Sequence, residues 1–227
     1  MAEKKKELRK CVIVEFDFTA IDGAKMLFDI TKRYLANLDG IPFDEKIEAK
    51  YLAGGNCQGA LAEYFAAVKT KKTAQKAARE LSEEFAAAVE EAAKTKITQG
   101  FRNFVKTLAD KGVLVVIATR ADLEKVRPAF EGIVGENAML YHEESKTYGT
   151  VKWDAWRRAC VAARVRHTMT VAVTGSGLGV KSALQAGMGS IAVINDHVAY
   201  QDFSGVNEVV KELNATTAKA ALGLLRV

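Results

Sequence analysis

Two acidic side chains stand two residues apart at the end of a short apolar run near the start of the chain. The run is Val12-Ile13-Val14, and Glu15 and Asp17 follow it directly. A short apolar run predicts a buried strand, and ligands in open α/β sheets bind beyond the carboxyl ends of the strands. The spacing therefore predicts an active site at this strand end, with carboxylates as its reactive groups.

Two later apolar runs also end in hydroxyl-bearing residues. Residues 113–118 lead into Thr119-Arg120, and residues 170–173 lead into Thr174-Gly175-Ser176. A Thr followed by an Arg is able to bind an anion, and the backbone N–H groups at a helix start are able to bind a phosphate. A Thr at a strand end also commonly caps the helix that follows. The sequence leaves both roles open for Thr119.

Strands and helices alternate through the second half of the chain. Runs of β-branched residues, typical of strands buried on both faces, alternate with amphipathic stretches of helical spacing. This alternation predicts a doubly wound α/β fold, in which a parallel sheet carries helices on both faces. The expected strands are residues 12–14, 113–118, 139–141, 170–173 and 191–194, and the expected helices are residues 101–108, 123–130, 154–164, 178–186 and 206–225.

Between the first strand and these elements lies a stretch of helical pattern that no predicted strand interrupts. Its expected helices are residues 26–38, 43–52, 58–68 and 74–95. About 70 residues of helix between two strands of one sheet predict a helical insertion. We therefore expect a core formed by residues 1–23 and 97–227, and an inserted helical cap formed by residues 24–96.

Four sequence motifs occur in one order along this framework. The first is Glu15-Phe16-Asp17-Phe18-Thr19 after an apolar strand, the second is Thr119 at a strand end, and the third is Lys152 ahead of a helix, with Lys146 nearby. The fourth follows the pattern S-x-x-G-x-x-A-A-x-A-A-G-M at Ser176, Gly179, Ala183, Ala186, Gly187 and Met188. In these motifs the chain resembles the haloacid dehalogenase-like (HAD) superfamily, chiefly phosphatases that use an aspartyl nucleophile and magnesium. The helical insertion sits where the family carries its type-1 cap.

The resemblance implies a role for each of these residues. In the family the first acid attacks phosphorus, and the second protonates the leaving oxygen and later activates water, which assigns Glu15 and Asp17. The Thr and the Lys of the second and third motifs hold the phosphoryl oxygens, which assigns Thr119 and Lys152. Substrate contacts are expected from three further residues, the last of them in a predicted cap loop: Arg120, Ser176 and Asn56.

Magnesium is the cofactor that the resemblance implies, because it offsets the repulsion between a carboxylate and a phosphate. Glu15 and Asp17 are the expected ligands, and Asp196, at the end of a neighbouring strand, joins them only if its loop folds back. The acids that the family carries in its fourth motif are replaced by Thr174 and Gly175. A site built from these residues has little charge with which to hold a metal.

The nucleophile position also departs from the family pattern, which has Asp where this chain has Glu15. One extra methylene displaces the carboxylate by about 1 Å, and a misplacement of that size costs on the order of 100-fold in rate. We therefore expect a HAD fold whose phosphatase activity is impaired or lost. The alternatives are a non-catalytic member that binds a phosphorylated ligand or a protein, and a NAD site at the turn of residues 175–179, with Asp196 lying 21 residues beyond Gly175.

Composition favours a soluble intracellular protein. The chain has 227 residues, 49% of them hydrophobic, and a net charge of +5, with a lopsided basic stretch only at residues 4–10. This stretch does not fit a signal peptide, and a solubilising tail is favoured over a contact for nucleic acid or anionic lipid. No apolar run approaches the ~20 residues that span a bilayer. Three distant cysteines predict reduced thiols. We expect a cytoplasmic protein whose partner is a small phosphorylated molecule, without nucleic acid or membrane, and with its oligomeric state left open.

Overall fold

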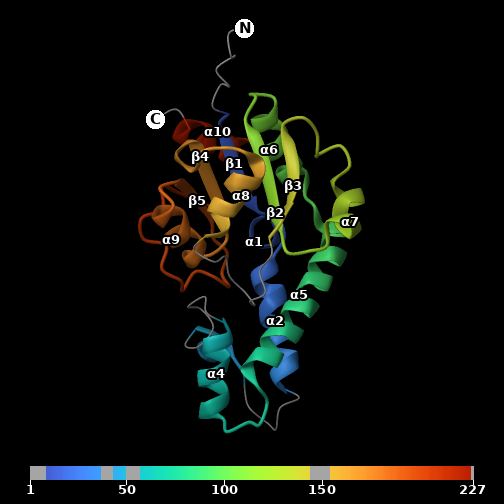
Figure 1. Ribbon diagram of the computed structural model, residues 1–227, viewed down its shortest axis with the longest axis vertical. Helices are drawn as coiled ribbons and strands as arrows, with labels where there is room; N and C mark the ends of the chain where they lie inside the picture. Colours follow the sequence, from blue (N-terminus) through green and yellow to red (C-terminus); the bar gives the residue numbers. More distant parts are fainter. Residues whose placement is uncertain (1–8, 37–42, 50–56, 144–153, 226–227) are drawn as a thin grey trace.

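A six-stranded parallel sheet forms the centre of the molecule (Figure 1). The computed structural model describes residues 9–36, 43–49, 57–143 and 154–225. The sheet order is β3-β2-β1-β4-β5-β6, so the chain begins in the middle and moves outward in both directions. The predicted doubly wound α/β fold is confirmed. The strands are β1 (Cys11–Glu15), β2 (Leu114–Thr119), β3 (Ala138–His142), β4 (Thr170–Thr174), β5 (Gly189–Val193) and β6 (Glu208–Val210).

Helices cover both faces of the sheet because successive strand residues point to opposite sides. On β1, Val12 and Val14 belong to the apolar cluster that contains α6 (Gln99–Ala109) and α10 (Ala215–Leu224). Cys11 and Ile13 belong to a second cluster, with α8 (Ala155–Ala163) and α9 (Gly177–Gln185). Glu15 continues the alternation on the α8 side. The central strand is thus buried on both faces, as its continuous apolar sequence predicts.

A helical block follows β1, and its helices are α2 (Gly23–Ala36), α3 (Glu45–Ile47), α4 (Cys57–Ala67) and α5 (Ala74–Lys96). It extends beyond the carboxyl ends of the strands (Figure 1). The short helix α1 (Phe16–Thr19) connects β1 to it. The apolar side chains of α2 and α5 belong to the same cluster as the α6 face of the sheet, so the block is packed onto the core. The cap boundaries at residues 24 and 96 stay a prediction.

Two expected elements differ in the structure. The helix expected over residues 206–225 begins only at Ala215, where the Asn214 side chain accepts hydrogen bonds from the Thr216 and Thr217 N–H groups. The preceding Glu208–Val210 forms the edge strand β6, paired with β5. The helix expected over residues 123–130 is α-helical only over Leu123–Val126 and continues as a 3₁₀-helix, because Pro128 lacks the N–H that an α-helix needs. Within the ranges described, no helix combines the length and the apolar character needed to cross a membrane.

Candidate functional site

Polar side chains meet at the carboxyl ends of the three central strands. β1 ends on Glu15, β2 on Thr119 and β4 on Thr174, and α1 adds Asp17 directly beyond β1. Parallel pairing in register sets Glu15 beside Ala118 and Val14 beside Val173, so the strand ends are level. All four polar side chains are buried, with at most 5% of any residue exposed. The predicted site is therefore assembled, but away from solvent.

Asp17 is held in place by the end of β2. The Thr119 hydroxyl donates to Oδ1 of Asp17 at 2.6 Å, and the Arg120 backbone N–H donates to Oδ2 at 2.9 Å. The Ala121 N–H in turn donates to the Thr119 hydroxyl oxygen at 3.1 Å. Both oxygens of this carboxylate accept hydrogen bonds. Because the Thr119 hydroxyl donates its proton to Asp17, it does not donate to a ligand in this arrangement.

Glu15 is held in the same way by the end of β4. The Thr174 hydroxyl donates to Oε2 of Glu15 at 2.6 Å, and the Gly175 N–H donates to the same oxygen at 3.3 Å. The other oxygen, Oε1, accepts no hydrogen bond from the described residues. Thr174 and Gly175, which stand where the family carries its fourth-motif acids, thus donate hydrogen bonds to Glu15, which stands where the family carries its nucleophile.

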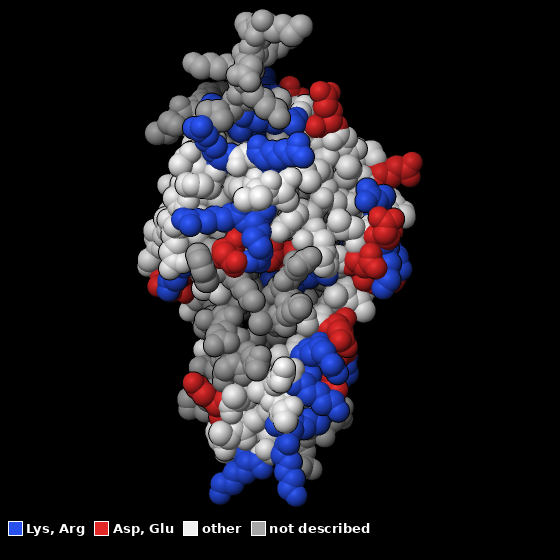
Figure 2. All heavy atoms as spheres, viewed as in Figure 1, with Lys and Arg blue, Asp and Glu red and all other residues white. Residues whose placement is uncertain are grey.

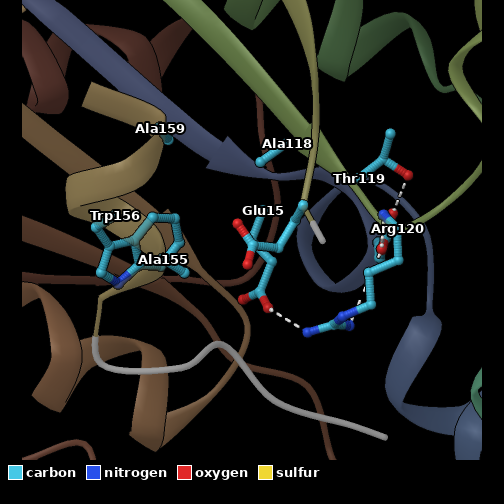
Figure 3. A pocket seen from close by; sticks show the side chains of 9 residues that line it. Glu15, Ala118, Thr119, Arg120, Ala155, Trp156 and Ala159 are labelled. Carbon is cyan, nitrogen blue, oxygen red and sulfur yellow. Dashed lines mark hydrogen bonds and ion pairs between the residues drawn. The ribbon is translucent and has the colours of Figure 1, made fainter. Parts of the chain in front are cut away.

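The guanidinium of Arg120 lies beside both carboxylates (Figure 3). Its Nη2 is 3.7 Å from Oε1 of Glu15, and its Nη1 is 4.0 Å from Oδ2 of Asp17. Its carbon Cζ lies 5.1 Å from the ring centroid of Phe18 and 6.0 Å from that of Phe85, which belongs to α5. These two rings stack on each other at 5.4 Å. A cation is therefore buried within the site and enclosed by aromatic rings from the core and the helical block.

Burial raises the pKa of Glu15 and of Asp17. Arg120 and the hydrogen-bond donors oppose this shift, because they favour the charged form of each carboxyl. Among the described residues, no second cation lies within ion-pair distance of either carboxylate. The pair therefore holds a proton more readily than two solvated acids would.

A small pocket opens beside Glu15 on the α8 side of the sheet (Figure 3). Its cavity volume is about 20 Å³, which is room for about one water molecule. The Trp156 ring forms one wall and donates from Nε1 to the Gly179 carbonyl oxygen at 3.0 Å. Glu143 contributes a third acid to the lining and is ion-paired with Arg158. A phosphate group needs more space than the described residues leave here.

The residues present do not fit a magnesium ion. Mg²⁺ requires octahedral oxygen ligands, whereas the Arg120 guanidinium lies 3.7 Å from Glu15 and 4.0 Å from Asp17, on the side where a second cation would be repelled. A Cβ at Gly175 would lie 2.3 Å from the Phe18 carbonyl oxygen, so an acid cannot replace this glycine without a backbone shift. The described residues hold no group of three or more His, Cys, Asp or Glu able to bind a metal, and Arg120 supplies the positive charge.

The other predicted site residues are placed as follows. The Ser176 hydroxyl oxygen accepts from the Gly179 N–H at 3.0 Å and so caps α9. A Cβ at Gly179 would lie 1.9 Å from the Thr174 hydroxyl oxygen, so close packing accounts for this glycine without a bound nucleotide. Asp196 is exposed in the turn after β5, and no recorded contact of the described residues joins it to Glu15 or Asp17. Lys152, Lys146 and Asn56 lie outside the described residues.

Sequence reasoning missed Glu143, Trp156 and Phe85. Glu143 follows β3 directly, and its position past a strand end at the same edge of the sheet was a usable signal. Trp156 lies four residues after Lys152, a predicted site residue, but, like Phe85, it was not expected to line the site.

Comparison with known proteins shows similarity in structure. No protein-family model and no curated protein sequence matches the chain. The fold is similar to that of β-phosphoglucomutase from Clostridium difficile, with a TM-score of 0.71 and 13% identity over 96% of this chain and 98% of that one. A phosphonoacetaldehyde hydrolase-like protein from Oleispira antarctica has a TM-score of 0.69 and 13% identity, over 100% of this chain and 97% of that one. A HAD hydrolase of family IA, variant 3, from Entamoeba histolytica has a TM-score of 0.68 and 18% identity, over 96% of this chain and 100% of that one.

At these identities the likeness establishes the fold. The matches span nearly all of this chain and of the similar chains. The parallel sheet and the helical block between its first two strands are therefore aligned together. The chain has the haloacid dehalogenase-like fold of the HAD hydrolases.

Proposed function

We propose that this chain is a HAD-fold protein that acts by binding and does not carry out magnesium-dependent phosphoryl transfer. The observation that supports this proposal is the guanidinium of Arg120, buried beside Glu15 and Asp17. An arginine side chain stays protonated in proteins. Its positive charge therefore offsets the negative charge of Glu15 and Asp17 without any bound metal ion.

Electrostatics argues against a phosphate at this strand end. A phosphate ester that approached Glu15 and Asp17 would bring negative charge toward two buried carboxylates, and like charges repel strongly where water is excluded. The Arg120 guanidinium that would attract the ester already lies 3.7 and 4.0 Å from those carboxylates, although its Nε and Nη1 donate no hydrogen bond within the described residues. A phosphate would have to compete with both acids for this one cation.

The hydrogen bonds of the two acids support the same proposal. A nucleophile needs a free oxygen aimed at the substrate, but Oε2 of Glu15 accepts from Thr174, and Oε1, which accepts no hydrogen bond from the described residues, is buried 3.7 Å from Arg120. A general acid must present its proton to the leaving group, but both oxygens of Asp17 accept from β2. In this arrangement the acids join β1 to β2 and β4, which is a structural role.

A second candidate function is the binding of a small phosphorylated molecule at the helical block. A cavity of about 250 Å³ is lined by Phe28, Lys32, Asp44 and Lys46. It has room for a phosphate group, and its two ammonium groups outnumber the one carboxylate, that of Asp44, so that the net charge of the lining favours an anion. Calorimetric titration with phosphate esters tests this candidate, and the double variant Lys32→Ala/Lys46→Ala should abolish any heat of binding.

A phosphatase assay tests the main proposal. The protein is incubated with a panel of phosphate esters with and without magnesium, beside the variants Glu15→Ala and Asp17→Ala. We expect the same background rate for all three proteins in both conditions. Magnesium-dependent turnover by the natural chain that Glu15→Ala removes would refute the proposal. The variant Arg120→Ala shows whether the guanidinium alone suppresses activity.

A further inference from the structure

The outer side of α8 and the segment after it form an exposed basic surface. This α8 surface consists of Arg157, Val161, Arg164, Arg166 and His167, and all five residues are exposed. α8 lies in front of the sheet in Figure 1, and in the same view Figure 2 shows basic side chains gathered over this face. The opposite side of the helix, with Trp156 and Cys160, is buried against the sheet.

Two of these residues share one side of the helix, and a third ends it. Arg157 and Val161 are separated by four residues, the spacing at which side chains neighbour each other on a helix, and Arg164 follows as the C-cap, three residues beyond Val161. Val161 is 77% exposed, the highest value among the exposed large hydrophobic residues in the described part of the chain. The two arginines lie about 10 Å apart along the axis at 1.5 Å per residue. An apolar side chain thus stands between two cations.

In the part of the chain that the structure describes, the arginines of this surface form no ion pair with an acid. Arg157 donates to the carbonyl oxygen of Gln185 at 3.3 Å. Within the described residues, no carboxylate lies within ion-pair distance of Arg157, Arg164 or Arg166, whereas three exposed arginines elsewhere are each paired with a glutamate: Arg33, Arg79 and Arg127. The charge of the α8 surface is therefore available to a binding partner.

The backbone at Arg164 adds a separate observation. Arg164 ends α8 with a φ of 56°, in the left-handed region. Its N–H donates to the Val161 carbonyl oxygen at 3.1 Å, and the Val165 N–H donates to that of Cys160 at 3.0 Å. Glycine is the usual residue in this kind of helix ending because it adopts positive φ without strain. The chain keeps a long cationic side chain at a position where the fold favours glycine.

We propose that the α8 surface binds an acidic segment of a partner protein. Arginine pairs with carboxylates through two parallel hydrogen bonds, so Arg157 and Arg164 would take two carboxylates that flank an apolar side chain resting on Val161. Single-stranded nucleic acid would be expected to use a row of aromatic stacking platforms, whereas this surface has no Phe, Tyr or Trp and a single imidazole, His167. The proposal does not depend on whether the strand-end site is active.

Fluorescence anisotropy with a labelled peptide tests this proposal. The probe is a fluorescein-labelled 14-residue peptide of glutamates with leucine at its centre, titrated with the full chain at about 150 mM salt, where distant charges are screened. We expect saturable binding. The double variant Arg157→Glu/Arg164→Glu should raise the dissociation constant about tenfold, because two attractive pairs become repulsive. Absence of saturable binding overturns the proposal.

A matched variant separates this surface from general attraction to a basic protein. Lys69→Glu/Lys71→Glu makes the same change in charge in the loop between α4 and α5, at the far end of the helical block from α8 (Figure 1). It should leave the dissociation constant within about twofold, because salt screens distant charges. Equal weakening by both double variants overturns the proposal. Tighter binding of a 12-nucleotide single-stranded RNA, or of phosphatidylserine vesicles, also overturns the assignment to an acidic protein segment.

Arg164→Gly separates binding from folding. We expect the melting temperature to rise, because glycine relieves the left-handed conformation, while the affinity for the peptide falls about threefold through the loss of one exposed pair. An unchanged affinity with a raised melting temperature would mean that Arg164 takes no part in binding.

Discussion

Replacing Arg120 by methionine removes the charge from the strand-end site and keeps most of the side-chain length. The methionine still contacts Phe18 and Phe85, but Glu15 and Asp17 lose their cation. At an effective dielectric constant of 20, each of these ion pairs contributes about 4 kcal/mol of Coulomb attraction. The buried carboxylates then have one way to limit the loss, which is to take up a proton.

Proton uptake sets the expected magnitude. The ordinary pKa of a glutamate is 4.5, so protonating it at pH 7 costs about 3.4 kcal/mol relative to the unfolded chain. The same step costs about 0.7 kcal/mol at pH 5. We therefore expect Arg120→Met to lower the free energy of unfolding by about 3 kcal/mol at pH 7 and by less than half of that at pH 5. Removal of one partner from other buried ion pairs costs about 3–5 kcal/mol.

Urea denaturation at the two pH values measures this loss. Glu15→Gln added to Arg120→Met should restore about half of the lost stability at pH 7, because one uncompensated carboxylate is gone. Arg157→Met serves as the control, since this exposed arginine is not ion-paired with any acid of the described ranges, and it should change stability by less than about 0.5 kcal/mol. A loss at Arg120 that is equal at both pH values, or no recovery in the double variant, would refute the electrostatic reasoning.

Three further changes follow from the same region. Because burial raises the pKa of Glu15, the folded state binds its proton more tightly than the unfolded chain, and stability falls as pH rises above about 4.5; Glu15→Gln should lose less stability than the natural chain between pH 4.5 and 7 in urea titrations. Gly179→Ala places a Cβ 1.9 Å from the Thr174 hydroxyl oxygen and should cost about 1–3 kcal/mol, whereas the matched Gly223→Ala in α10, with open space around it, should be neutral or stabilising by thermal denaturation. Phe85→Ala removes the aromatic cover of the site and should cost about 3–5 kcal/mol, measured in the same way; a cost below 1 kcal/mol would contradict that role.

Much of the core was predictable because its signals are local. Continuous β-branched runs such as residues 114–119 have few other interpretations, and the acids at the end of β1 mark the edge of the sheet where sites form. The alternation of strands and helices then predicts a parallel sheet. β6 was missed because three residues carry too little pattern to separate a strand from a loop.

The internal neutralisation of the site was not predictable from the sequence. Arg120 reads as an exposed residue that binds an anion, because arginine is rarely buried. Its burial depends on the rings of Phe18 and Phe85, which meet only when α5 packs against α1. Likewise, Thr174 reads as a lost acid, whereas the structure makes its hydroxyl a hydrogen-bond donor to Glu15. Both contacts join residues that are far apart in the sequence, and the spacing of residues along the chain does not predict them.

The central position of β1 in the sheet has a consequence for folding during synthesis. β1 is made first but lies between β2 and β4, with Cys11 paired to Leu114 on one side and to Thr170 on the other. At roughly 5–20 residues per second on the ribosome, β4 emerges on the order of 10–30 s after β1. Throughout that interval this strand, buried along its whole length in the folded protein, has an open edge that other chains can join. Protection by the ribosome or by a chaperone during translation therefore matters more for this protein than for one whose first strand lies at the edge of its sheet.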